Sequence, residues 1–230
     1  MTMKLENVVP FGRSLDEYRK MFALSKRELG LNILGVADGP ASFNAELSAF
    51  GGRVTSIDPI YAFEAPQIKT RFDNVLDNII DQVKATPDDW VWSYHGSPGG
   101  LRANRIRVTD RFVEDFMMRR DSGCYIAGEL PSLPFADQQF DLALCSHFLF
   151  LYSEHFSLEF HWASILEMLR IAKEVRIFPL LTLMLEKSPY LATILERLPR
   201  EGYSVAIHRV EYQLQRGGNE MLAIHRMADV

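Results

Sequence analysis

The sequence predicts an α/β fold in which helices cover both faces of a mostly parallel sheet. Short apolar runs of strand length alternate along the chain with segments of helical periodicity. A complete strand–helix–strand unit lies within residues 31–58, which favours parallel strands joined by a right-handed crossover. Near the C-terminus, two alternating segments joined across "QRGG" (residues 215–218) have the pattern of a β-hairpin. The hairpin adds one antiparallel strand.

The N-terminal part predicts a helix followed by the strand–helix–strand unit. Ser14 and Glu17 have the spacing of a capping box, so a helix is expected from Ser14. Strands are expected at 31–36 and 53–58, with a helix at 41–50 between them. That helix is expected to bury Phe43, Leu47 and Phe50.

Residues 61–122 form an insert between the second and third strands. Helical spacing predicts a helix over 66–85, and the Gly/Pro-rich residues 88–105 predict a loop. A further helix is expected to begin at Thr109. The insert is either a lid over the binding site or a decoration of this family. Apolar positions at helical spacing in 66–85 are Ile68, Phe72, Leu76, Ile79 and Val83.

The remaining segments complete the alternation. Strands are expected at 124–128, 140–147 and 174–180. Helices are expected at 157–172, with Ser157 as cap, and after Ser188. Residues 1–230 are expected to form one domain, with residues 1–30 as an N-terminal helical segment.

Composition argues against several partners. A net charge of −5 and a pI near 5.7 give no electrostatic reason to expect nucleic acid. The short basic cluster Arg102, Arg105 and Arg107 is interpreted as a solvated loop, with an anion contact as the alternative. The apolar run at 178–185 is too short to span a bilayer. No metal-ligand spacing is present, so no metal site is expected, and the oligomeric state is left open.

Cysteine content and the N-terminus indicate a cytoplasmic protein. Cys124 and Cys145 lack CxxC spacing, which favours a reduced compartment. The first residues have no apolar h-region of a signal peptide.

Chemistry-bearing residues follow the strands at their carboxyl ends, where ligands bind in open α/β sheets. In the turn after the first strand, Asp38 either attracts an ammonium group or caps the next helix, whose free amides can hold an anion. Asp58 ends the second strand, where a carboxylate can accept hydrogen bonds from ribose hydroxyls. Pro59, Ile60 and Tyr61 are expected along an adenine face.

Two further strand ends add candidates. Glu129 and Leu130 follow the short third strand, where they can contact an adenine ring. Ser146 and His147 emerge from the fourth strand, and His147 is either functional or hydrogen-bonded to backbone. Phe148 follows in the same segment.

These blocks together resemble the class I S-adenosylmethionine-dependent methyltransferases. The clearest matches are "LPSLPFADQQFDLALCSHFLFLY" and "ILEMLRIAKEVRIFPLL", and the resemblance covers about residues 31–226. It implies a Rossmann-like three-layer sandwich whose seven-stranded, mostly parallel sheet has one antiparallel strand from a C-terminal hairpin. The cofactor implied is S-adenosylmethionine.

The resemblance also assigns roles. Gly35 stands where the family's first motif opens with an acid, and Asp38 is the candidate replacement. His147 and Tyr152 are the candidate catalytic residues. The residues expected to bind the cofactor are Gly35, Ala37, Asp38, Gly39, Pro40, Ser42, Asp58, Pro59, Ile60, Glu129, Leu130, Ser146 and Phe148.

The function this implies is methyl transfer to a small-molecule acceptor. The alternative is a non-catalytic protein that keeps the fold as a binding or regulatory module. A nicotinamide-dependent dehydrogenase is less favoured, because the first turn lacks the G-x-G-x-x-G pattern. Acceptor choice is expected to lie in the N-terminal helix and the 61–122 insert.

Overall fold

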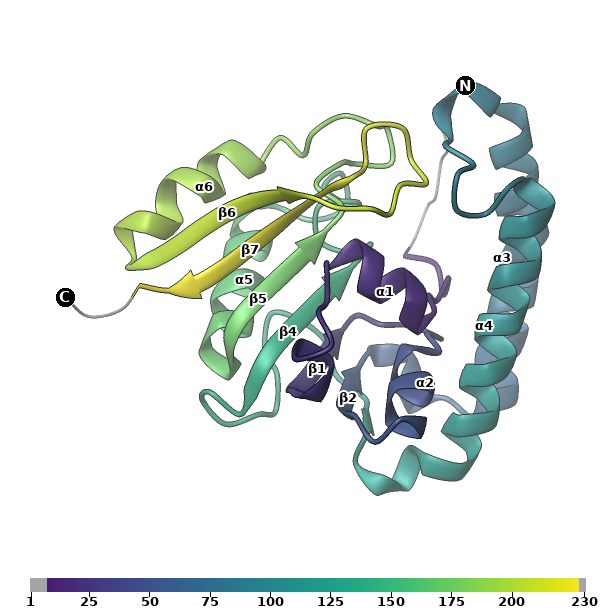
Figure 1. The fold of residues 1–230 in the computed structure, drawn as a ribbon, viewed down its shortest axis with the longest axis horizontal. Helices are drawn as coiled ribbons and strands as arrows, with labels where there is room; N and C mark the ends of the chain where they lie inside the picture. Colours follow the sequence, from purple (N-terminus) through teal and green to yellow (C-terminus); the bar gives the residue numbers. More distant parts are fainter. Residues whose placement is uncertain (1–7, 228–230) are drawn as a thin grey trace.

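The computed structural model describes residues 8–227, and within them seven strands form one sheet in the order β3-β2-β1-β4-β5-β7-β6 (Figure 1). Neighbouring strands pair in parallel except that β7 runs antiparallel to both β5 and β6. This confirms the predicted fold class. The strands are β1 (Asn32–Val36), β2 (Arg53–Ile57), β3 (Tyr125–Ile126), β4 (Phe140–Ser146), β5 (Ala172–Phe178), β6 (Tyr203–Arg209) and β7 (Glu220–Arg226).

Alternate side chains of the strands supply two separate cores, which makes three layers. In β4, Leu142 and Leu144 pack with α1 (Leu15–Met21) and α2 (Phe43–Ala49) on one face. Ala143 and Cys145 face the other way. There they pack with α5 (Leu158–Ile171) and α6 (Leu191–Arg200). The period of two along a strand therefore separates the helical layers.

The insert is a hairpin of two long helices, α3 (Ala65–Ala85) and α4 (Pro98–Arg119), side by side at the β2 end of the sheet (Figure 1). The predicted start at Thr109 is wrong, because α4 begins eleven residues earlier. The predicted loop at 88–105 is confirmed only for residues 90–97, since a short helical turn occupies Pro87–Asp89 and α4 begins at Pro98. Ser97 caps it by accepting a hydrogen bond from the Gly100 amide, and proline occupies the first turn. Gly100 is required there, since a β-carbon would lie 2.0 Å from the His95 carbonyl oxygen.

Arg105 is fully buried, so the interpretation of its basic cluster as a solvated loop is wrong at this position. Its guanidinium donates to both carboxylate oxygens of Glu17, at 2.7 and 2.9 Å. The Tyr212 hydroxyl donates to the same carboxylate at 3.1 Å and lies 3.0 Å from Nε2 of His95. We call Glu17, His95, Arg105 and Tyr212 the Glu17–Arg105 network. It joins α1, α4 and the β6–β7 connection.

The surroundings of the Glu17–Arg105 network determine which of its side chains are ionised. Burial opposes ionisation of Glu17, but the charge and hydrogen bonds of Arg105 outweigh it and lower the carboxyl pKa to about 2. Burial, with the charge of Arg105, lowers the pKa of His95 to about 4, so that imidazole is neutral near pH 7. The Glu17–Arg105 network is therefore a neutral unit, one cation with one anion.

Three smaller expectations also need correction. Phe50 lies beyond the end of α2 and is 83% exposed, so it does not share the buried face of Phe43 and Leu47. The C-terminal hairpin is longer than a tight "QRGG" turn, because β6 ends at Arg209 and residues 210–219 leave the sheet. The last helix begins at Leu191, not directly after Ser188.

Candidate functional site

A cavity of about 1240 Å³ lies at the carboxyl ends of the parallel strands. Its floor comes from residues that follow β1, β2, β3 and β4. Its walls come from residues 8–11, from Arg13 and Tyr18, and from one face of α3. β1 and β4 are neighbours in the sheet, and the chain turns to opposite sides after them. Ligand sites of open α/β sheets are found at this type of switch point.

Most of the sequence-predicted site residues line this one cavity, although they come from four strand ends. Five predicted residues do not line it. Gly35, Pro40 and Ser42 were expected at the cofactor, Tyr61 along the adenine face, and Tyr152 in catalysis. The predicted residues that line the cavity are Ala37, Asp38, Gly39, Asp58, Pro59, Ile60, Glu129, Leu130, Ser146, His147 and Phe148.

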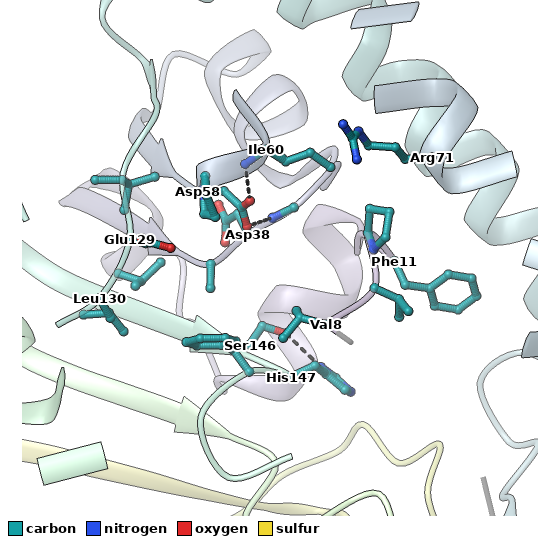
Figure 2. Close-up of a pocket in the computed structure, with 18 of the residues that line it drawn as sticks. Val8, Phe11, Asp38, Asp58, Ile60, Arg71, Glu129, Leu130, Ser146 and His147 are labelled. Atoms are coloured by element: carbon teal, nitrogen blue, oxygen red, sulfur yellow. Dashed lines mark hydrogen bonds between the residues drawn. The ribbon is translucent and has the colours of Figure 1, made fainter. Parts of the chain in front are cut away.

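Asp58 is held by two backbone amides (Figure 2). Its Oδ2 accepts from the Gly39 amide and its Oδ1 from the Ile60 amide, both at 2.8 Å. Burial raises the pKa of this carboxyl to about 6, against the opposing effect of the two amide bonds. Each oxygen accepts one donor and keeps capacity for another. The carboxylate is therefore fixed in place and still able to bind a ligand hydroxyl.

Asp38 points back over β1 and does not cap α2. The Tyr18 hydroxyl donates to its Oδ1 at 2.5 Å and the Ser56 hydroxyl to its Oδ2 at 2.6 Å. The residue is 6% exposed, and burial raises the pKa of its carboxyl to about 6. The capping interpretation of Asp38 is therefore wrong, whereas its place in the cavity lining fits the alternative role near a cation.

The N-terminal segment covers the turn that follows β1. A β-carbon on Gly12 would lie 2.1 Å from the Pro40 carbonyl oxygen, so the two backbones are in direct contact. Residues 41–45 are all buried, and the Ser42 hydroxyl donates to Glu46. The expectation that free amides at the start of α2 hold an anion therefore has no support in this arrangement. Pro40 and Ser42 are shielded from the cavity for the same reason.

His147 follows β4 in the left-handed region, with φ of +51°. Its amide donates to the Phe178 carbonyl at 2.6 Å, and its Nδ1 lies 2.9 Å from the Ser146 hydroxyl. Burial, together with the charges of Arg13 and Arg105, lowers the pKa of the imidazole well below its usual value. His147 is therefore neutral near pH 7, the state in which a histidine accepts a proton.

The Ser146 hydroxyl lies within 3.8 Å of the Met21 sulfur as a donor. If it donates there, Nδ1–H of His147 donates to Ser146 and Nε2 is left as the acceptor. Within residues 8–227, that Nε2 has no hydrogen-bond partner. The pair thus has an arrangement in which His147 acts as a base through Nε2.

Tyr152 lies behind the cavity wall. Its side chain is 2% exposed, and its hydroxyl accepts a hydrogen bond from the Val9 amide at 3.3 Å. The catalytic role predicted for Tyr152 has no support in this geometry, because the hydroxyl anchors the N-terminal segment instead. Tyr61 is similar: it is buried, and its hydroxyl donates to the Gly39 carbonyl at 2.7 Å.

The sequence predicts acceptor selection in the N-terminal helix and the 61–122 insert without identifying residues there. The structure brings Arg13, Arg71, Asn74 and Asn78 into the lining. The α3 residues have the spacing of one helical face. In the sequence they look like the ordinary solvated side of an amphipathic helix, so only the fold identifies them.

Comparison with other proteins places the chain in a family. No protein-family model matches it. The uncharacterized protein MJ0045 of Methanocaldococcus jannaschii is 34% identical over 225 residues, which cover 97% of this chain and 99% of the relative. The chain belongs to the MJ0045 family. Nearly the full length of both proteins is aligned, so the strand ends, the insert and the C-terminal hairpin all fall within the shared region.

Solved structures with a similar backbone fold include magnesium protoporphyrin IX methyltransferase from Synechocystis PCC 6803 with bound SAH. It is 15% identical, with a TM-score of 0.49, over 92% of this chain and 81% of that one. The PH0226 protein from Pyrococcus horikoshii OT3 is 12% identical, with a TM-score of 0.49, over 92% and 89%. Membership of the MJ0045 family rests on the sequence relative and not on these structures.

Residues 8–227 contain neither a candidate membrane-spanning helix nor a candidate metal cluster. No described helix is both long and apolar enough to cross a membrane. In the same part of the chain, no three His, Cys, Asp or Glu side chains gather so that they could hold a metal ion.

Proposed function

We propose that the chain is an S-adenosylmethionine-dependent methyltransferase that acts on a small-molecule acceptor. One observation carries the proposal. The strand-end acids and the histidine, which the sequence blocks resembling class I methyltransferases singled out, line one cavity at the switch point of the sheet.

The cavity suits this cofactor in size and in chemistry. Pockets for single small ligands span about 300–1,000 Å³, and about 1240 Å³ leaves room for a cofactor and an acceptor together. Asp58 would hold the ribose hydroxyls through the free capacity of its oxygens. Ile60 and Leu130 would enclose the adenine ring, with Glu129 beside it. Ala37, Asp38 and Gly39 would face the methionine end.

When bound, the cofactor supplies a methyl group on a positively charged sulfur. The residues of the chain do the rest. Asp38 and Asp58, once ionised, favour a cation in the cavity. His147, neutral and with Nε2 free, takes the proton from an oxygen or nitrogen nucleophile of the acceptor. Phe148, packed against Phe156 and Phe160, limits access of water on that side.

Calorimetric titration with S-adenosylmethionine tests the proposal. The wild-type chain should bind it with micromolar-to-millimolar affinity. Asp58→Ala should weaken binding by about tenfold or more, because it removes charge-assisted hydrogen bonds. Asp121→Ala is the matched control, since Asp121 is an exposed acid outside the cavity lining. Absence of binding to the folded wild-type chain would contradict the proposal.

His147→Asn tests catalysis separately from binding. Asparagine tolerates the left-handed backbone at this position, so the fold should persist. We expect S-adenosylmethionine affinity to stay within about twofold, while methyl transfer to an identified acceptor falls by about 10²–10⁴. Transfer unchanged in His147→Asn would remove His147 from the mechanism.

A binding or regulatory protein is the second candidate, and one observation favours it. The turn after β1 is covered by Gly12, and both oxygens of Asp38 already have donors within the chain. The methionine end of the cofactor would therefore meet fewer free binding groups in this turn than the first motif of class I methyltransferases provides. Cofactor binding that depends on Asp58, with no transfer to any acceptor in a broad small-molecule panel, would favour this candidate.

A further inference from the structure

We propose that Arg13 binds an anionic group, a carboxylate or a phosphate, on the methyl acceptor. The inference rests on the proposed function, because it names the chemical class of that reaction's second substrate. Three observations support it. Arg13 lacks hydrogen-bond and ion-pair partners, the network behind it does not neutralise its charge, and acidic and basic side chains lie on opposite sides of the cavity.

Arg13 lines the cavity with most of its hydrogen-bonding capacity unused. Its Nη1 donates to the Phe11 carbonyl oxygen. Its Nε is buried and has no hydrogen-bond partner. Among residues 8–227, no carboxylate lies within ion-pair distance of its guanidinium. A guanidinium has five N–H donors, and a buried donor without a partner costs about 1–3 kcal/mol. An anion in the cavity would satisfy these donors.

The groups behind Arg13 do not neutralise it. Glu17 is the nearby buried carboxylate, and both of its oxygens are bound to Arg105. Because His95 is neutral, Arg13 adds one uncompensated positive charge to the Glu17–Arg105 network. Burial and the neighbouring charge of Arg105 lower the pKa of Arg13 to about 10. The guanidinium is still charged near pH 7 but lacks a counter-ion, and a ligand anion would supply one.

Arg71, on α3, gives the cavity lining a second cation without a carboxylate partner among the described residues. Its guanidinium lies 3.9 Å from the centroid of the Phe63 ring. Asn74 and Asn78 continue the same face of α3 along the cavity. Stacking on Phe63 leaves the in-plane donors of Arg71 free for a ligand.

Charges of opposite sign occupy opposite sides of the cavity (Figure 2). Asp38, Asp58 and Glu129 lie together at the strand ends, whereas Arg71 lies on the far side with Phe11. The acidic side suits a cationic cofactor, and the basic side suits an anionic partner. Arg13 is also near enough to His147 to lower the pKa of that imidazole. An anion on Arg13 would therefore bring the acceptor close to the proposed base.

The same chemistry has a second source, the methionine carboxylate of the cofactor, and the experiment separates the two. Calorimetry with S-adenosylhomocysteine and with 5′-methylthioadenosine, which lacks the amino-acid end, compares the wild-type chain with Arg13→Gln. Inorganic phosphate is then titrated into each protein saturated with S-adenosylhomocysteine, at constant ionic strength. Arg111→Gln is the control, since Arg111 lies on α4 outside this cavity.

We expect Arg13→Gln to weaken phosphate binding about tenfold or more, with both adenosine ligands unchanged within about twofold. Arg71→Gln should weaken phosphate binding less, because Arg71 is exposed. Phosphate binding unchanged in Arg13→Gln would overturn the inference. So would weakened binding of S-adenosylhomocysteine with unchanged binding of methylthioadenosine, since the anion would then be the cofactor's own carboxylate.

A measurement on the wild-type chain guards against a variant that fails to fold. Phenylglyoxal modifies accessible guanidiniums, and mass spectrometry reports the extent at each arginine. Phosphate should slow modification of Arg13 but not of Arg111, and equal rates at both would contradict the inference. If the wild-type chain binds phosphate through Arg13 but neither adenosine ligand, the proposed function fails while the anion site stands.

Discussion

The carboxyl group of Asp38 occupies the space that a side chain at position 35 would need. A β-carbon on Gly35 would lie 1.8 Å from Oδ2 of Asp38 and 2.4 Å from its Cγ. The sequence resemblance puts an acid at position 35, and this chain has a glycine there with an acid three residues later. The structure shows that the later acid folds back against the earlier position. The two positions are thus coupled sterically.

This coupling predicts a non-additive pair of substitutions. Gly35→Ala should lower the free energy of unfolding by about 1–3 kcal/mol, because the methyl group displaces the Asp38 carboxyl from Tyr18 and Ser56. In an Asp38→Ala background the same change should cost less, by about 1 kcal/mol or more. Urea unfolding of the four proteins gives the coupling energy. Gly30→Ala, with open space at the β-carbon, is the control; additivity at 35 and 38 would contradict the contact.

The turn after β1 predicts opposite effects of two exchanges between alanine and glycine. Ala37 and Gly39 both have positive φ, of +54° and +56°. Ala37→Gly should raise the free energy of unfolding by about 1 kcal/mol, because it relieves left-handed strain. Gly39→Ala should lower it by about 1 kcal/mol. Crowding does not explain the second effect, since the nearest atom to that β-carbon is 4.0 Å away. Thermal or urea denaturation measures both changes in the free energy of unfolding. Changes of the same sign would contradict the left-handed backbone at positions 37 and 39.

The raised pKa of Asp38 predicts how stability depends on pH. The folded state holds this proton with a pKa of about 6, against an ordinary value of 3.8, so it binds more protons than the unfolded state between these limits. Stability from this group is therefore greatest below pH 3.8 and falls as the pH rises to about 6. The difference in unfolding free energy between wild type and Asp38→Asn should fall over the same window and be flat above pH 7. A constant difference would contradict the raised pKa.

The proton on Asp58 predicts the pH dependence of cofactor affinity. Its pKa is about 6 without ligand, and the ionised form accepts hydroxyl donors better. Affinity for S-adenosylmethionine should therefore rise with pH through about 6 and level off above it. Calorimetry between pH 5 and 8 measures this trend. In Asp58→Asn the rise should be smaller, and an equal rise would assign it to another group.

The buried pair of Glu17 and Arg105 predicts a large loss of stability. Arg105→Gln should lower the free energy of unfolding by about 3–5 kcal/mol, because it leaves the Glu17 carboxylate buried without its counter-ion. Arg111→Gln breaks an exposed pair with Glu114 at 3.6 Å and should cost about 0.5 kcal/mol or less. Denaturant unfolding compares the two. Similar losses of unfolding free energy in the two variants would contradict the prediction that the buried Glu17–Arg105 pair matters more for stability than an exposed pair.

Local rules account for what the sequence predicted correctly. Alternating periodicities identify strands and helices because burial repeats every two or 3.6 residues. The sequence places Asp58 and His147 at one edge of the sheet, because each ends a buried strand and the carboxyl ends of parallel strands meet there. The start of α4 was missed because "SPGG" reads equally as a loop and as a capped helix. Ser97 and Pro98 favour the helix, while Gly100 is explained only by its contact with the His95 carbonyl.

Features that depend on distant partners were not predictable. Arg105 looked solvated beside Arg102 and Arg107, yet its partner Glu17 lies 88 residues away. Arg13 has no motif around it, and its significance comes from what the fold brings near it. Tyr152 looked catalytic because it follows the β4 motif closely. Its hydroxyl accepts a hydrogen bond from the amide of Val9, 143 residues earlier in the chain, and Tyr152 does not line the cavity.

The Glu17–Arg105 network joins residues that are made far apart in time during synthesis. Glu17 leaves the ribosome early, but Tyr212, which donates to its carboxylate, follows 195 residues later. Domains generally fold as units while the chain is made. The wall that carries Arg13 therefore gains its contact with the β6–β7 connection only after Tyr212 has been made.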